Sequence, residues 1–415
     1  MYRFALSPTE DMHLGNLRVA LLNYLCAKKD GARFHVRIMD SNKARNGDGK
    51  DQEMLNTLAV FGISYDVLHY QSEALKFHHQ CAASLLSNGK AFSCFCTSQT
   101  LKTKEEIAKR NGEAYLYDGT CETLSNEEVL NNEGPFTVRI KASTQNPERF
   151  VLLHHDKSPT EDFACAVDDM LQGVGVVLDD EECVARASKH EYIRHSLGFN
   201  ETLRTVALPA LLNTKGEKMG AQDDGWRVDW LLEQGFLPQA ISNYLLLLST
   251  NAPCELFTAE EALAWLDASK GFAPSAPFDI RTLRHLNREH LLRMEDAKLA
   301  ALLDFSGADF GKLAKIYAKE APTLKELKPK LHAIFSSKVA PKGAEEAFKT
   351  LQNALLQAPH CQTLEALRAH LELTCKGEPP PLELLYVLLT GSSHGPALEE
   401  LYPLITPHLK EIIRS

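Results

Sequence analysis

The sequence predicts an α/β fold with a doubly wound parallel sheet, followed by an all-α region. Short apolar strands alternate with amphipathic helices over residues 1–75, and strands separated by helices of this length pack into a parallel sheet. From Trp226 onward, apolar side chains recur at helical spacing instead. A polar stretch at residues 76–147 interrupts the first pattern, so we expect an insertion there.

The individual elements follow from their side chains. Strands are predicted at four short apolar or alternating runs, residues 2–5, 33–38, 150–153 and 174–178. A Ser-Pro-Thr turn ends the first of these strands. Helices are predicted at residues 17–25 and 51–61, where apolar side chains recur every three or four residues.

Composition limits the class of protein. A chain of 415 residues suggests about three domains, and 44% apolar with 24% charged residues is typical of folded globular proteins. The longest apolar run, Tyr244–Leu248, is far shorter than the ~18 residues of a membrane span. The first four residues lack a secretory pattern, so we expect a cytoplasmic location. The net charge of −10 argues against nonspecific coating of nucleic acid, although a local basic face stays possible.

A candidate phosphate site follows the first strand. His13-Leu14-Gly15-Asn16 opens the first predicted helix, whose unpaired N–H groups can bind a phosphate. Gly15 permits close approach of a ligand to the backbone, and His13 could donate a hydrogen bond. On these four residues alone, an ordinary helix start explains the pattern equally well.

A candidate metal site lies in the insertion. Cys94, Cys96 and Cys121 are grouped among otherwise scattered cysteines. Three thiolates with a fourth ligand can hold zinc, and grouped cysteines in a reducing compartment are more typical of a metal site than of disulfides. Spacing alone leaves three buried thiols as an equal alternative.

The string from Arg3 to Thr9, followed by residues 13–16, resembles the opening of glutamyl-tRNA synthetases, which are class I aminoacyl-tRNA synthetases. The usual family pattern is RFAPSPTG followed by HIGG or HIGN. Further segments match the family in order: residues 37–40, 70–72, 157–160, 163–164, 168–169, 208–209, 216–219, 234–240, 243–244 and 390–396. The resemblance therefore extends over nearly the whole chain.

This resemblance implies a Rossmann-type catalytic domain with a zinc-containing insertion, followed by helical tRNA-binding domains. The implied limits are 1–75 and 148–212 for the two catalytic halves, 76–147 for the insertion, 213–305 for a loop and stem-contact domain, and 306–415 for an anticodon-binding domain. The implied partners are tRNA and a small amino acid. ATP with Mg²⁺ and structural Zn²⁺ are the implied cofactors, and the protein is expected to be a monomer that binds no membrane.

The resemblance also implies residue roles. The nucleotide-binding residues would be His13, Gly15, Asn16 and Lys218, of which His13 and Lys218 would also act in catalysis. The amino-acid substrate would contact Arg3, Ala5, Ser7, Glu161, Cys165 and Asp179. Zinc would be held by Cys94, Cys96, Tyr117 and Cys121.

Several positions depart from the family pattern. Met39 replaces a family Glu, Glu161 a Tyr, and Asp179 the Arg that binds the side-chain carboxylate of glutamate. Two like charges 4 Å apart repel by about 4 kcal/mol at an intermediate dielectric, so exchanging Arg for Asp is a large change. In the ATP loop, Ala221 and Gln222 replace a Lys and an Arg. Losing one fixed cation aimed at developing charge typically lowers the rate by about 10²–10³.

Three functions are compatible with this sequence. The first is an ATP-dependent ligase that activates glutamate, or a related amino acid, and transfers it to tRNA. The second is a catalytically impaired paralogue that binds tRNA or a partner without aminoacylation, and the third is a ligase retuned for a different substrate. Eight lysines between residues 312 and 342 predict phosphate contacts or a solvated helix face.

Overall fold

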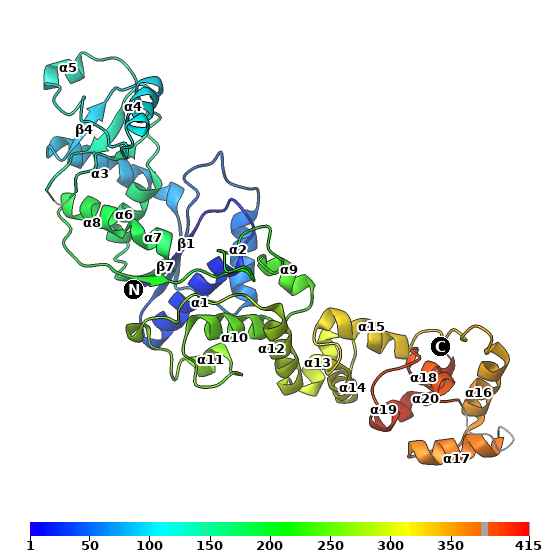
Figure 1. Cartoon of the computed structure of the whole chain (residues 1–415). Coiled ribbons are helices and arrows are strands. Elements are labelled where there is room, and N and C mark those ends of the chain that lie inside the picture. The colour runs from blue at the N-terminus through cyan, green and yellow to red at the C-terminus, as the bar shows by residue number, and fades with distance from the viewer. Residues whose placement is uncertain (145, 375–380, 415) are drawn as a thin grey trace. The chain divides into compact units, whose positions relative to one another are not determined.

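The computed structural model of the protein describes residues 1–144, 146–374 and 381–414. These residues form two compact units. Unit 1 comprises Met1–Val228, Leu245–Pro253 and Ala259–Phe278. Unit 2 comprises Asp229–Tyr244, Cys254–Thr258 and the described part of 279–415. Figure 1 shows the helices and strands of both units.

Unit 1 is built on a five-stranded sheet in which every described pairing is parallel, which confirms the predicted fold class. The strand order is β3-β2-β1-β7-β8. The strands are β1 (Tyr2–Leu6), β2 (Phe34–Ile38), β3 (Val67–Tyr70), β7 (Val176–Asp180) and β8 (Arg204–Leu208). Because β1 pairs with both β2 and β7, the strand order reverses at β1, and ligands of such sheets bind beside this reversal, at the carboxyl ends of the strands.

Helix α1 (Leu14–Lys29) fixes the geometry of this region. It is buried along most of its length, not along one face only as its apolar spacing predicts. Asn23 explains how a polar residue can lie in this core. Its side chain donates to the Leu178 carbonyl at 2.7 Å and accepts from the Leu178 N–H at 3.1 Å. These bonds hold α1 against β7.

A second, antiparallel sheet forms in the region of the predicted insertion, with the order β4-β5-β6. Its strands are β4 (Ala91–Cys94), β5 (Thr137–Ile140) and β6 (Val151–Leu153). The strand predicted at residues 150–153 therefore forms, but it pairs with β5 and not with the parallel sheet. An apolar run predicts burial and does not specify a partner strand. Leu152 and Leu153 pack in a core with Phe163 of α6 (Glu161–Leu171).

The remaining helices of unit 1 connect and cover these sheets (Figure 1). They are α2 (Lys50–Val60), η1 (Gln71–Ala74), α3 (Leu75–Ser87), α4 (Ser98–Arg110), α5 (Asn126–Leu130), α7 (Glu181–Ala185), α8 (Ala187–Ser196), α11 (Ala259–Ala262) and η2 (Ala268–Lys270). Two helices contribute residues to both units, α9 (Val228–Glu233) and α10 (Pro238–Ser249).

Unit 2 is helical, as predicted. Its helices are α12 (Ile280–Arg293), α13 (Asp296–Leu302), α14 (Ala308–Ala318), α15 (Leu324–Ile334), α16 (Glu345–Gln357), α17 (Leu364–Thr374), α18 (Leu382–Thr390), α19 (Leu398–Ile405), η3 (Thr406–His408) and α20 (Leu409–Arg414). Their apolar faces share one core, in which Leu313, Leu331 and Tyr402 are almost fully buried. Among the described residues, no helix is long and apolar enough to cross a membrane.

In the lysine-rich run of unit 2, four of the eight lysines pair with acidic residues. Lys315 pairs with Asp296 and Lys328 pairs with Asp304, while Lys319 reaches Glu400 of α19. Lys338 caps the end of α15 by donating to the backbone carbonyl of Ile334 at 2.8 Å. Lysines counted along the sequence therefore overstate the basic surface, because their acidic partners lie outside the counted run.

Candidate active site

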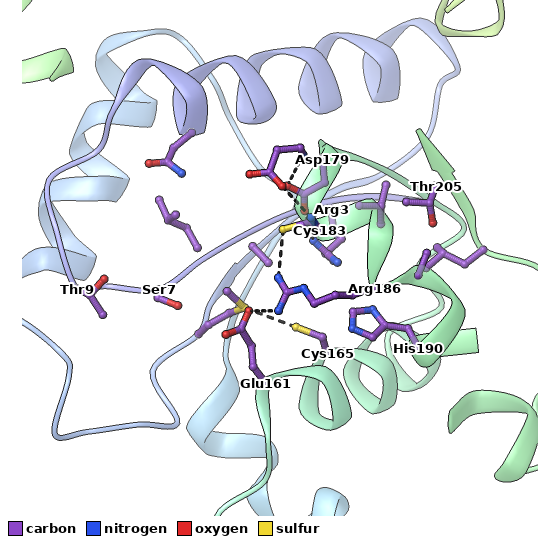
Figure 2. A pocket seen from close by; sticks show the side chains of 18 of the residues that line it. Arg3, Ser7, Thr9, Glu161, Cys165, Asp179, Cys183, Arg186, His190 and Thr205 are labelled. Carbon is purple, nitrogen blue, oxygen red and sulfur yellow. Dashed lines mark hydrogen bonds and ion pairs between the residues drawn. The ribbon is translucent and has the colours of Figure 1, made fainter. Parts of the chain in front are cut away.

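A pocket opens at the carboxyl ends of β1 and β7, where the strand order reverses. It contains all six residues assigned to the substrate by resemblance, Arg3, Ala5, Ser7, Glu161, Cys165 and Asp179. Figure 2 labels all of them except Ala5, and shows the labelled side chains coming from β1, the loop after it, α6 and β7. We call this space the amino-acid pocket. Tertiary structure thus brings together residues that lie far apart in the chain.

The guanidinium of Arg3 is largely committed to acidic partners beside the pocket. Its Nε donates to Asp169 Oδ1 at 3.0 Å, and its Nη2 donates to Asp169 Oδ2 at 3.3 Å. Arg37 contacts the same carboxylate at 2.8 Å. Burial opposes ionisation of Asp169, but Arg3 and Arg37 overcome it and lower the pKa of this carboxyl to about 2. Only Nη1 of Arg3 is left for a ligand or for Asp179.

Asp179 faces this remaining nitrogen. Its Oδ2 lies 3.6 Å from Arg3 Nη1, in the wall of the amino-acid pocket. Burial raises the pKa of Asp179, although the charge of Arg3 acts in the opposite direction. Met39 adds no charge, and its sulfur lies 3.6 Å from the Cys165 thiol. Of the departures seen in the sequence, Met39, Glu161 and Asp179 line the pocket, whereas Ala221 and Gln222 do not.

Arg186 supplies the pocket with a cation that the resemblance to the family does not imply. Its Nη1 donates to Glu161 Oε1 at 2.9 Å, and its Nη2 donates to the Cys183 sulfur at 3.3 Å. Figure 2 shows this side chain reaching toward both partners within the pocket. The sequence contains a signal for this cation, because Arg186, His190 and Arg194 recur every four residues and so lie on one side of a helix.

His13 caps α1 and lines the amino-acid pocket. Its Nδ1 accepts from the Asn16 N–H at 3.2 Å, while Asn16 Oδ1 accepts from the His13 N–H at 3.3 Å. Burial lowers the pKa of His13 to about 4, so the ring is neutral at pH 7. Because Nδ1 accepts, the ring proton lies on Nε2, where it can be donated. The ring also stacks on Trp226, with centroids 4.1 Å apart.

A second pocket adjoins the first and contains Gly15 and Lys218. The two pockets share the wall residues Ala5, His13, Asn16, Asp179 and Asp180. Trp226 also lines this second space. A methyl group on Gly15 would approach the Trp226 ring to 3.5 Å and His13 to 3.0 Å, so the backbone is open there only because residue 15 is glycine. We call this space the nucleotide pocket.

The positive charges of the nucleotide pocket were only partly visible in the sequence. Lys218 pairs with Glu182, and this hydrogen bond raises the pKa of its ammonium. Arg18 is buried in the same pocket, and its Nε has no hydrogen-bond partner among the described residues. Burial lowers the pKa of Arg18 to about 10, so it stays charged at pH 7. Arg18 and Trp226 are among the wall residues that sequence reasoning missed.

The loop after Lys218 is held by its own hydrogen bonds. Asp223, which the sequence places next to the missing cations, accepts from the Gly220 N–H at 2.9 Å and so closes a turn. The backbone then continues beside the first helix, where the Leu14 N–H donates to the Trp226 carbonyl at 2.9 Å. Arg227 pairs with Asp11 at 2.9 Å. The carboxylate of Asp223 therefore has a role in loop structure.

The four residues proposed as metal ligands converge in the antiparallel region. The sulfurs of Cys94, Cys96 and Cys121 all lie within 4.8 Å of one another. The Tyr117 hydroxyl lies 3.3 Å from the Cys94 sulfur and 3.4 Å from the Cys96 sulfur. Three sulfurs and one oxygen at these separations fit the small tetrahedral donor set that zinc prefers. The structure thus places a fourth donor beside the thiols.

Comparisons with known proteins agree with this architecture. The family model of the class I tRNA synthetases for E and Q, catalytic domain, matches residues 1–285. The chain is 43% identical to glutamate--tRNA ligase 1 of Campylobacter jejuni strain 81-176, and the alignment covers 100% of both chains. Identity to glutamate--tRNA ligase 1 of Campylobacter concisus strain 13826 is 42%, again over 100% of each chain.

Solved structures share the fold of the chain. A glutamate tRNA ligase from Elizabethkingia meningosepticum, crystallised in complex with its amino acid, superposes with a TM-score of 0.83 at 21% identity. The comparison covers 100% of this chain and 98% of that structure. The match to the family model over more than half of the chain, together with the full-length identity above, settles the family. The chain belongs to the glutamyl-tRNA synthetase family of class I aminoacyl-tRNA synthetases.

Proposed function

We propose that this protein is a glutamate–tRNA ligase that activates glutamate with ATP and transfers the glutamyl group to tRNA. The observation that carries the proposal is the wall shared by the two pockets. Because Ala5, His13 and Asn16 line both spaces, a carboxylate in one pocket and an α-phosphate in the other would meet at this wall. Full-length relatives named glutamate--tRNA ligase support the same function.

The first half-reaction would take place at the shared wall. The α-carboxylate of glutamate attacks the α-phosphorus of ATP, a new oxygen–phosphorus bond forms, and pyrophosphate leaves with the electrons of the broken bond. His13 Nε2–H would donate to a phosphate oxygen, and Lys218 would offset charge on the departing group. The N-terminus of α1 at Gly15 and Asn16 would add backbone N–H donors. Mg²⁺ would accompany ATP as its counter-ion.

The second half-reaction consumes the adenylate. A hydroxyl of the terminal ribose of tRNA attacks the acyl carbon, its proton is released, and AMP leaves. No side chain of this protein would form a covalent bond with the substrate, so the rate enhancement would come from positioning and fixed charges. Unit 2 would hold the tRNA, and the lysine-rich run at residues 312–342 is a candidate for phosphate contacts. The four domain limits, at residues 75, 147, 212 and 305, and a monomeric state are part of this proposal.

A structural zinc ion forms the other part of the proposal. Cys94, Cys96, Tyr117 and Cys121 would hold it, since their donor atoms already converge. Bound zinc would tie the Cys94 end of β4 to the loop before α5, in a region with few large apolar side chains. The ion would stabilise this region and take no part in adenylate formation.

The proposal is tested by ATP–pyrophosphate exchange on purified protein in the presence of total tRNA. We expect exchange that depends on glutamate and exceeds exchange with every other amino acid tested. Stronger exchange with a different amino acid would show that this amino acid, and not glutamate, is the substrate. If no exchange occurred while the protein still bound zinc and tRNA, the protein would be a binding paralogue and the proposed ligase activity would be wrong.

A further inference from the structure

One face of α8 carries a row of basic side chains into the amino-acid pocket. Arg186, His190 and Arg194 are spaced by four residues, and all three line this pocket. We call them the α8 basic row. On α6, Glu161 and Cys165 line the same pocket. The pocket therefore lies between a basic helix face and the acidic end of α6.

Arg194 is the most buried member of this row, and the described residues do not supply a hydrogen-bond acceptor for its Nε. It is 4% exposed, and its Nε is sealed from solvent without a hydrogen-bond partner among the described residues. Burial also lowers the pKa of its guanidinium. A buried cation without adequate partners is destabilising, and an anion that enters the pocket can supply the missing acceptor. Arg194 is therefore better explained by a bound ligand than by the protein's own packing.

Arg186 lies at the outer end of the row, where its Nη1 is 2.9 Å from Glu161 Oε1 and 3.5 Å from Asp162 Oδ1. Its side chain is 36% exposed, and that of Glu161 is 50% exposed. Ion pairs with this much solvent exposure contribute little to stability, so a ligand carboxylate can take the place of Glu161. Arg186 can offer two parallel N–H groups, which is the geometry that carboxylates bind best.

Arg3 is less available for the same task. Two of its nitrogens are bonded to Asp169, and the third faces Asp179. A substrate carboxylate at Arg3 would also approach Asp179, a like charge when ionised. Acidic side chains also line the pocket, among them Glu191 of α8. Arg194, whose Nε finds no acceptor among the described residues, is therefore the cation that is left for a ligand.

We propose that Arg186 and Arg194 bind the side-chain carboxylate of the amino-acid substrate and determine its specificity. This inference rests on the proposed function, because it takes glutamate as the ligand. In this arrangement the carboxylate site has moved from the end of β7 to the face of α8. Glutamine, which lacks the negative charge, would bind these two arginines less well than glutamate.

The test measures equilibrium binding of glutamate and of ATP by calorimetry, so that it does not depend on turnover. We expect Arg186→Gln and Arg194→Gln each to weaken glutamate binding by roughly 10- to 100-fold, the usual loss for a hydrogen bond to a charged group. ATP affinity should stay unchanged, and the preference for glutamate over glutamine should fall. Lys189→Gln is the matched control, since Lys189 lies on the same helix but pairs with Glu148 outside the pocket.

Arg194 is buried, so its variants are first checked by thermal melting. If Arg194→Gln does not fold, Arg194→Met and Arg186→Gln decide the question, because the first removes the charge but keeps an apolar side chain in the core and the second lies at an exposed site. Glutamate binding by these folded variants that equals that of the unmodified protein would overturn the inference. Unmodified protein that binds glutamate but catalyses no exchange would contradict the proposed function alone, while unmodified protein that binds neither glutamate nor aspartate would contradict both.

Discussion

The nucleotide pocket and the amino-acid pocket share a wall but are built in different ways. At the nucleotide pocket, His13, Gly15 and Asn16 sit within one helix turn, and their geometry follows from the cap of α1. At the amino-acid pocket, charges arrive from separate elements, so a cation can be lost from one element and supplied by another. Asp179 on β7 and Arg186 before α8 are the two sides of such an exchange. A site built from neighbouring residues is therefore easier to recognise in a sequence than a site whose charged residues come from separate elements.

The largest expected effect concerns the nucleotide pocket. We expect His13→Asn to lower the maximal exchange rate by about 10²–10³, because it removes the Nε2 donor aimed at the phosphates. Asn is a favourable N-cap residue, so the helix start and the melting temperature should be nearly unchanged. In His13→Ala the rate should fall equally, and about 1 kcal/mol of stability should be lost as well. A His13→Asn enzyme with a normal rate would show that this pocket is not used as we describe.

A second prediction adds cations to the exposed loop after Lys218, next to the nucleotide pocket. Ala221→Lys with Gln222→Arg should raise the exchange rate by about 10-fold or more, because each added cation can approach the departing pyrophosphate. The Michaelis constant for glutamate should change little. Asp224→Lys serves as a control for general charge, since residue 224 is exposed in the same loop. If Asp224→Lys raised the exchange rate equally, the effect would come from the overall charge of the loop and not from contact between the added cations and pyrophosphate.

A third prediction concerns the charge of Asp179 in the amino-acid pocket. Asp179→Asn should tighten glutamate binding by about 10-fold, because it removes a negative charge beside Arg3. Burial raises the pKa of Asp179, so protonation on lowering the pH should also tighten glutamate binding in the unmodified protein. The sign follows because the protonated carboxyl is neutral and no longer repels the ligand. Titrations of glutamate at several pH values should show this trend, and the trend should be absent in Asp179→Asn.

The smallest effect on adenylate formation is expected from the metal site. Cys121→Ser or treatment with a strong chelator should remove zinc and lower the melting temperature of the insertion, while exchange should change little, because the metal residues do not line either pocket. Charging of tRNA should suffer more than exchange does. Cys254→Ser is the control, since this thiol is exposed and lies outside the cluster. Metal analysis and the ratio of the two rates would check this, and an equal loss of both rates would contradict the assigned role.

Much of the fold could be predicted from periodicity. The alternation of strands and helices over residues 1–75 predicted the parallel sheet, and the helical spacing after Trp226 predicted the helical unit. Strands β3 and β8 were missed, because their short sequences do not stand out from neighbouring segments. The run at residues 150–153 was recognised as a strand, but its pairing with β5 depends on neighbours that the run itself does not encode.

The sequence by itself determined the features whose partners are close in the chain. The cap between His13 and Asn16, the open backbone at Gly15 and the Cys-x-Cys pair are of this kind. Tertiary structure alone decided the charges of the amino-acid pocket. Arg3 meets Asp169 across 166 positions of the chain, and Arg186 meets Glu161 across 25. The physical reason is that a charge acts through distance and dielectric in the folded protein, and neither can be read from its place in the sequence.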